Sequence, residues 1–132
     1  MIGLDTNVLV RYIAQDDTRQ SPKATRLIES LTIAAPGYVS IISVIELVWV
    51  LTSCYGSTKD EIGAVLETLL RTKEIVVANA DVVWKAERQF KESQASDFAD
   101  CLIKCAADEM GCEYTATFDR NAAKHCGMRM IG

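Results

Sequence analysis

Four acidic residues have the clearest chemical potential in this chain: Asp5, Glu46, Asp100 and Asp119. Each is predicted to lie where a strand passes into a helix, or within the first turns of a helix. In open parallel sheets such positions gather at one edge, where ligands bind. Several carboxylates there would repel one another, since two like charges about 4 Å apart cost roughly 4 kcal/mol at an effective dielectric near 20. We therefore predict one carboxylate cluster that holds a divalent cation.

Carboxylate oxygens are hard ligands, which select Mg²⁺ or Mn²⁺ rather than zinc. A bound ion of this kind can orient and activate water, and it can neutralise the charge that develops on a phosphodiester in the transition state. The residue types thus indicate metal-dependent hydrolysis of phosphodiester bonds.

Each acid also has a structural interpretation. Asp5 could cap a helix that begins near Asn7, since aspartate is strongly preferred at helix N-termini. Ser43 and Glu46 form the S-x-x-E pattern of a capping box. Glu46 nevertheless lies among apolar residues, where a buried glutamate is rare unless it is paired or bound. The capping and binding roles are compatible.

Asp97 and Asp100 are three positions apart, so both can face one side of a helix. Ser96 is a plausible cap for that helix, and Asp97 would then interact favourably with the helix dipole in the first turn. Asp100 lies one turn further on, beside Leu102 and Ile103, and is harder to explain as a solvated surface group.

The elements that position these acids alternate between short strands and longer helices. Helices are expected to start at Ser21-Pro22, at Ser43, after the turn 56–58, at Asp81 and near Ser96, and the helix that starts at Ser43 should be buried on most sides. The expected strands are residues 1–4, 38–42, 75–77, 113–118 and 128–131. This order predicts one α/β domain over residues 1–132, with a mainly parallel sheet of four to five strands covered by helices on both faces.

Composition fits an ordinary globular protein, with 49% hydrophobic and 24% charged residues. The longest apolar run, residues 44–51, is interrupted by Glu46 and is too short to cross a bilayer. The N-terminus lacks the basic start of a signal peptide, and five cysteines without framework spacing do not suggest disulfides. We therefore expect a cytoplasmic protein without a membrane partner, in which most cysteines lie in or near the core.

The net charge of −4 argues against a broad basic surface for nucleic acid. Basic residues could still form one rim of a site: Arg11, Arg71, Lys73, Arg120, Lys124 and Arg129. Arg11 and Arg120 stand near acidic motifs, so each could contact a phosphate or form an ion pair with the acidic cluster.

Four segments resemble, in order and spacing, the motifs of the PIN domain, and most closely those of the VapC-type toxin ribonucleases of bacterial toxin-antitoxin pairs. They are LDTNVLVRY (4–12), SVIELVWVL (43–51), DFADCLI (97–103) and TFDRNA (117–122). The resemblance spans essentially the whole chain. It implies a three-layer α/β/α fold whose acidic pocket holds one or two Mg²⁺ or Mn²⁺ ions and cleaves RNA endonucleolytically.

By position, the resemblance makes Asp5 and Asp100 the principal metal ligands, with Glu46 and Asp119 completing the pocket. Asp97 would contribute through water or a second ion, while Thr6 and Asn7 would hydrogen-bond a carboxylate or bound water. It further implies a homodimer, and a VapB-type antitoxin whose tail lies in or near the active-site groove, in a toxin-antitoxin assembly.

Rival interpretations stay open. An aspartyl-phosphate phosphatase would also place Asp5 after the first strand, but the second aspartate expected two positions on is Asn7 here. A PIN-like module could instead bind RNA or protein without cutting. Other residues suit packing better than chemistry: Trp49 and Trp84 as core or dimer-interface aromatics rather than base-stacking platforms, and Cys101, Cys105, His125 and Cys126 as packed side chains rather than zinc ligands.

Overall fold

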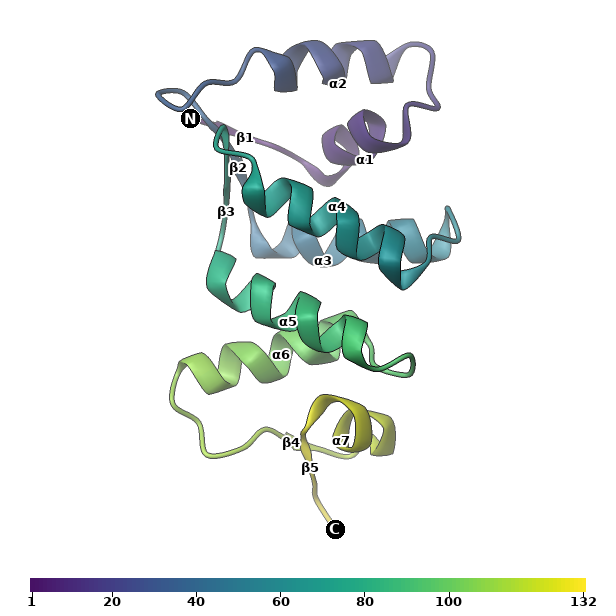
Figure 1. Cartoon of the computed structure of the whole chain (residues 1–132), viewed down its shortest axis with the longest axis vertical. Helices are drawn as coiled ribbons and strands as arrows, with labels where there is room; N and C mark the ends of the chain where they lie inside the picture. Colours follow the sequence, from purple (N-terminus) through teal and green to yellow (C-terminus); the bar gives the residue numbers. More distant parts are fainter. The chain divides into compact units, whose positions relative to one another are not determined.

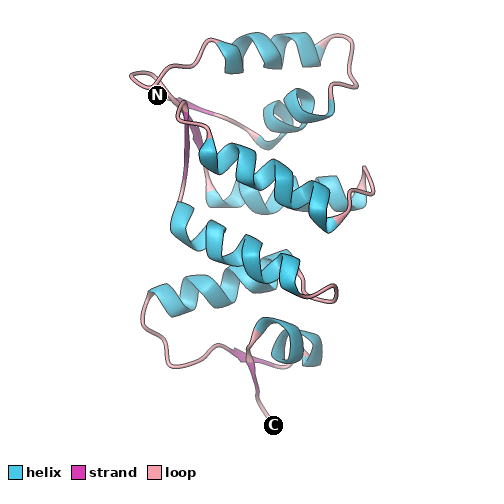
Figure 2. Ribbon diagram, in the orientation of Figure 1, coloured by secondary structure: helices cyan, strands magenta, loops and turns pink.

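The computed structural model describes every residue of the chain, 1–132, and contains seven helices and five short strands (Figure 1). Helices make up most of the regular structure (Figure 2). Every strand pair is parallel, so the predicted α/β class with a mainly parallel sheet is confirmed. The five strands form a three-stranded sheet and a separate two-stranded sheet.

Contacts between residues divide the chain into two compact units, Met1–Ala80 and Asp81–Gly132. The single domain over residues 1–132 stays a prediction. No helix combines the length and the apolar character that crossing a lipid bilayer requires.

The first unit contains the three-stranded sheet, in the order β1-β2-β3. The strands are Ile2–Gly3, Gly37–Val39 and Ile75–Val77. In the middle strand, Gly37 approaches its neighbours closely: a Cβ atom there would lie 2.7 Å from Leu4 Cδ1 and 2.9 Å from Leu31 Cδ1. Because Leu4 immediately precedes Asp5, this close packing fixes the chain that leads into the first acidic motif.

Four helices complete the first unit: α1 (Thr6–Ala14), α2 (Gln20–Glu29), α3 (Ile41–Ser53) and α4 (Lys59–Arg71). Helix α1 packs against both α2 and α3, and α4 packs against β3 and α3. Apolar side chains on these helices and strands are buried, as the 3.6-residue pattern predicts. They include Leu4, Leu9, Val39, Val44, Leu47, Leu51, Ile62 and Leu66.

Helix starts in the first unit follow capping chemistry. The turn before α4 caps it as predicted, because Thr58 and Glu61 form a reciprocal capping box. The start predicted at Ser21-Pro22, with Ser21 as the cap, lies too late, since α2 begins at Gln20. Asp17 supplies the cap from outside the helix, with Oδ1 accepting from the Gln20 amide at 2.7 Å.

The second unit contains α5 from Asp81 on, α6 and α7, with the two-stranded sheet of β4 and β5. Their bounds are α5 Ala80–Glu92, α6 Phe98–Glu109, β4 Ala116–Thr117, α7 Arg120–Cys126 and β5 Arg129–Met130. The rings of Phe90 and Phe98 meet edge to face, with centroids 5.7 Å apart, and join the ends of α5 and α6. Helix α7 packs against α6, β4 and β5. The residue after its last turn, Gly127, is the C-cap, and its φ of 74° lies in the left-handed region that favours glycine.

Candidate acidic site

Asp5 is the second residue after strand β1 and the N-cap of α1. Its Oδ1 accepts a hydrogen bond of 2.8 Å from the Thr6 amide. That amide is one of those that a helix start leaves without a partner. The side chain of Asp5 is exposed. The capping interpretation of Asp5 is therefore correct, and the second carboxylate oxygen remains available for another ligand.

Glu46 lies on α3 and receives a hydrogen bond from the first helix of the chain. Thr6 Oγ1 donates to Glu46 Oε1 at 2.7 Å, across 40 positions of sequence. Thr6 itself is buried, whereas Glu46 is exposed. The contact holds a carboxylate of α3 beside the start of α1, next to Asp5.

The capping-box interpretation of Glu46 is wrong. Helix α3 begins at Ile41, and its cap is Ser40, whose side chain accepts from the Ser43 amide at 3.1 Å. Glu46 consequently lies beyond the first turn, out of reach of the helix start. The prediction that this helix is buried on most sides is also wrong: Val44, Leu47 and Leu51 are buried, but the opposite face is exposed.

A cavity of about 390 Å³ adjoins these groups. It is lined by Asp5, Thr6, Asn7, Ile45, Glu46, Trp49 and Val50. Trp49 is 64% exposed, so of its two predicted positions the core is wrong, and the dimer interface stays a prediction. The available signal was its spacing, because a residue three positions after Glu46 lies on the same side of the helix.

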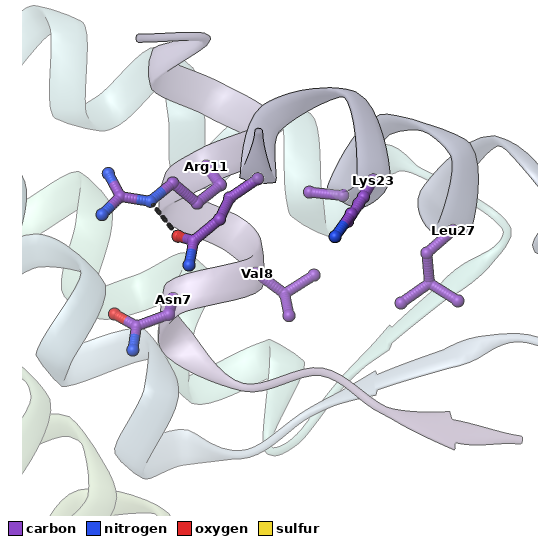
Figure 3. A pocket seen from close by; sticks show the side chains of 7 residues that line it. Asn7, Val8, Arg11, Lys23 and Leu27 are labelled. Atoms are coloured by element: carbon purple, nitrogen blue, oxygen red, sulfur yellow. Dashed lines mark hydrogen bonds between the residues drawn. The ribbon is translucent and has the colours of Figure 1, made fainter. Parts of the chain in front are cut away.

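Arg11 is held by polar neighbours other than the candidate acids. Its Nε donates to Gln20 Oε1 at 2.7 Å, and its Nη1 lies 3.6 Å from Asp16 Oδ1. Figure 3 shows Arg11 on α1 at a second pocket, of about 260 Å³, where Lys23 of α2 also lies. Arg11 therefore pairs with Asp16 rather than with the acidic motif beside it.

In the second unit, two candidate aspartates are helix caps. Asp97 is the N-cap of α6 and accepts from the Asp100 amide at 3.2 Å. Asp119 is the second residue after β4 and the N-cap of α7, with Oδ1 accepting from the Asn121 amide at 2.8 Å. The cap predicted at Ser96 is wrong, because that side chain is buried and donates backward, to the carbonyl of Phe90 at 3.1 Å.

Asp100 is not a cap but lies in the first turn of α6, rather than one turn further in as predicted. Its charged form is nevertheless disfavoured there. Partial burial raises the pKa of its carboxyl above the ordinary 3.8, and the like charges of Asp97 and Asp119 raise it further. These three carboxylates thus interact through space at the packed ends of α6 and α7. A cation among them would reverse the direction of this pKa shift.

The remaining candidates lie near the same helices. Arg120, the first residue of α7, is exposed. Cys101 and Cys126 are buried, with Sγ atoms 3.6 Å apart, and burial together with Cys126 raises the pKa of Cys101 to about 12. His125 Nδ1 lies 3.0 Å from Ser93 Oγ. The thiol of Cys101 is therefore an inert packing group, since the reactive form is the thiolate.

The structure thus brings Thr6 and Glu46 together in the first unit, and Asp97, Asp100 and Asp119 in the second. In neither unit do three or more Asp, Glu, His or Cys side chains stand close enough to hold a metal ion as they are. The single pocket predicted from all five acids stays a prediction.

Parallel strands followed directly by acidic helix caps define an α/β protein with carboxylates at its strand ends. The family comparison is more specific: the PIN domain model matches residues 2–127. The chain therefore belongs to the PIN domain family, and its structure is consistent with the PIN-like fold. Family membership supports a nuclease-type function in general. No significant match was found among curated proteins.

Proposed function

We propose that this protein is a metal-dependent endoribonuclease and the toxin of a VapC-type toxin-antitoxin pair. The family match supports the nuclease class and spans all five acidic candidates. The resemblance of the four motifs to VapC-type toxins supports the choice of RNA as substrate. On this proposal Asp5, Glu46, Asp100 and Asp119 are the catalytic acids.

The observation that carries the proposal is the position of Asp100. Helix capping accounts for Asp5, Asp97 and Asp119, whereas Asp100 lies in the first turn of α6 without being its cap. Its charged form is disfavoured by burial and by two like-charged neighbours. A carboxylate in such a place is typical of functional sites, where a cation supplies the missing stabilisation.

The donor set fits Mg²⁺ or Mn²⁺, because every candidate ligand is a carboxylate oxygen. Asp5 and Asp100 would be the principal ligands, supported by Glu46 and Asp119, with Asp97 acting through water or a second ion. When bound, the ion activates water and neutralises charge on the phosphodiester.

The chain's own residues orient the reacting groups. Thr6 fixes one oxygen of Glu46, which leaves the other oxygen to hydrogen-bond a water molecule in the adjoining cavity. Backbone amides hold one oxygen each of Asp5 and Asp119. Arg120 is exposed directly after Asp119 and would contact a phosphate, whereas Arg11 would first have to leave Asp16.

The biological setting follows from the same resemblance. We propose a cytoplasmic homodimer that is neutralised by a VapB-type antitoxin, alone or in a larger assembly. Control of this kind would protect the cell from its own nuclease.

The test is cleavage of a total-RNA pool by purified protein with Mg²⁺, with Mn²⁺ and with a chelator, beside an Asp5→Asn variant. The proposal expects cuts at discrete sites that require metal and disappear in the variant. Folded protein, free of antitoxin, that cuts nothing in either metal would instead favour a PIN-like module that binds RNA or protein.

A further inference from the structure

Trp49 is the only aromatic residue of α3, and its side chain is exposed beside the candidate site. The side chain is 64% exposed, although Val48 on the same helix is buried. Trp49 lies three positions after Glu46, so the two residues share one side of the helix. Both line the cavity that also contains Asp5.

This cavity has two kinds of wall. Its polar wall consists of Asp5, Thr6, Asn7 and Glu46, and its apolar wall consists of Ile45, Trp49 and Val50. Its volume of about 390 Å³ is at the lower end of the range of small-ligand sites. The flat, largely apolar base of a nucleotide matches the apolar wall. Its phosphate would face the polar wall through the cation of the proposed function, because the carboxylates of Asp5 and Glu46 alone would repel it.

We propose that Trp49 stacks on a nucleobase next to the phosphodiester that is cut, and so positions single-stranded RNA. The inference rests on the proposed function and deepens it. Stacking on an aromatic ring tolerates every base, because each base has a π-face. It requires a base that has left its helix, so the site selects unpaired over duplex RNA.

A second copy of the chain is the competing occupant, because Ile42 is also exposed on α3, at 66%. However, Ile42 does not line the cavity, whereas Trp49 shares it with the site's polar groups. A second copy seated on Trp49 would therefore also close the cavity to substrate. A nucleotide uses both walls at once.

The chain has only two tryptophans, so fluorescence can test each one separately. A Trp84→Phe variant leaves Trp49 as the only tryptophan, and Trp49→Phe leaves the half-buried Trp84 as a matched control. Both are titrated with a single-stranded 2′-O-methyl oligonucleotide, which resists cleavage, in the presence of Mg²⁺. We expect saturable quenching of Trp49, little change at Trp84, and much weaker quenching by a duplex of the same sequence.

Affinity for the same oligonucleotide gives an independent readout by anisotropy. Trp49→Ala should weaken binding about 5- to 150-fold, the range expected for loss of one base–aromatic stack. Trp49→Tyr should restore most of it, and Ile42→Ala, an exposed apolar change on the same helix, should leave it unchanged. The mass of each variant in solution is measured in parallel.

Equal quenching of both tryptophans, or unchanged affinity in Trp49→Ala, would overturn the stacking role. It would also be overturned if Trp49→Ala and Ile42→Ala both reduced the mass to a monomer and lost RNA together, since a second copy would then cover this face. RNA cleavage without Trp49 stacking leaves the nuclease proposal intact. Stacking in a protein that cuts no RNA would reject the nuclease and, with it, the placement of Trp49 beside a cut phosphodiester.

Discussion

The two units hold their acidic residues in different ways. In the first unit Glu46 accepts a hydrogen bond from Thr6, and Asp5 accepts one from the amide at the start of α1. In the second unit Asp100 is partly buried, with the like charges of Asp97 and Asp119 acting on it. The first arrangement orients carboxylates by neutral donors, whereas the second leaves one carboxylate that a cation would stabilise.

In the first unit hydrogen bonds orient the carboxylates, whereas in the second unit charge repulsion acts on a carboxylate. Substitutions in the first unit should change stability mainly through the loss of hydrogen bonds. Substitutions at Asp100 should also relieve repulsion, and so change stability in the opposite direction. Measurements of RNA cleavage and of stability on the same variants therefore distinguish the two units directly.

The largest effect is expected on cleavage in Asp5→Asn and Asp100→Asn. Each removes a ligand charge with little change in size, and metal stabilisation of the transition state contributes several kcal/mol. At about 1.4 kcal/mol per factor of ten, RNA cleavage should fall on the order of 10³-fold in both. Initial cleavage rates at saturating Mg²⁺ give the measurement.

Circular dichroism and thermal melting serve as the control for this pair. Asparagine caps helices about as well as aspartate, so Asp5→Asn should keep its fold. Unfolding of that variant would mean that the charge of Asp5 is needed for the fold, and the loss of cleavage could then not be assigned to a missing metal ligand. Full activity in either folded variant would remove that residue from the catalytic set.

Loss of the hydrogen bond between α1 and α3 should have an intermediate effect. Thr6→Val keeps the side-chain shape but deletes the donor to Glu46. A hydrogen bond to a charged group contributes about 1.5–3 kcal/mol, so cleavage should fall about tenfold or more. Thr6→Ser, which keeps the hydroxyl, is the matched control; if both variants cleave alike, the hydroxyl has no such role.

Asp119 offers a way to separate capping from chemistry. Asp119→Ala removes both the cap of α7 and a carboxylate, and loss of an N-cap costs about 0.5–2 kcal/mol. Asp119→Asn should keep the stability measured by urea unfolding while still lowering cleavage. Equal stability losses in the two variants would show that the charge, rather than the cap, holds the start of α7.

The smallest expected effect is the pH dependence of stability at Asp100. Its pKa in the folded protein is raised above 3.8, so the folded state keeps this proton over a range in which the unfolded chain has lost it. The free energy of unfolding therefore falls as pH rises through that range. Without metal, Asp100→Asn should be more stable than the wild type at pH 7, and this gain should disappear below pH 3.8.

Melting curves at several pH values, with and without Mg²⁺, make this measurement. Added Mg²⁺ should stabilise the wild type more than Asp100→Asn, since only the wild type has the charge that the ion would offset. An Asp100→Asn protein that is less stable than the wild type at pH 7 without metal would contradict the account of repulsion.

Local patterns were sufficient to predict the parts of the fold that depend on local chemistry. Asp5 and Asp119 each follow a short strand and start a helix, and an aspartate before a helical apolar pattern is a strong start signal. The capping box of Thr58 and Glu61 is equally local. The parallel pairing followed from the alternation of strands and helices.

The predictions from sequence were wrong where contacts between residues far apart in the chain determine the structure. Ser40 and Ser43 are both good caps, and sequence could not tell which one α3 would use. Apolar residues occur all around that helix, so its exposed face could not be recognised from sequence, and the core was one of the two positions predicted for Trp49. The hydrogen bond from Thr6 to Glu46 joins residues 40 positions apart, so no local sequence pattern could predict it.

The capping bonds of Asp5 and Asp119 have a further thermodynamic consequence. A free side chain that becomes ordered on binding costs about 0.5–1.5 kcal/mol in conformational entropy. Here one oxygen of each carboxylate is already held by a backbone amide, so much of that rotational freedom is lost when the helix forms. Folding therefore carries part of the entropic cost of binding, and any ligand of these two residues meets side chains that are already oriented.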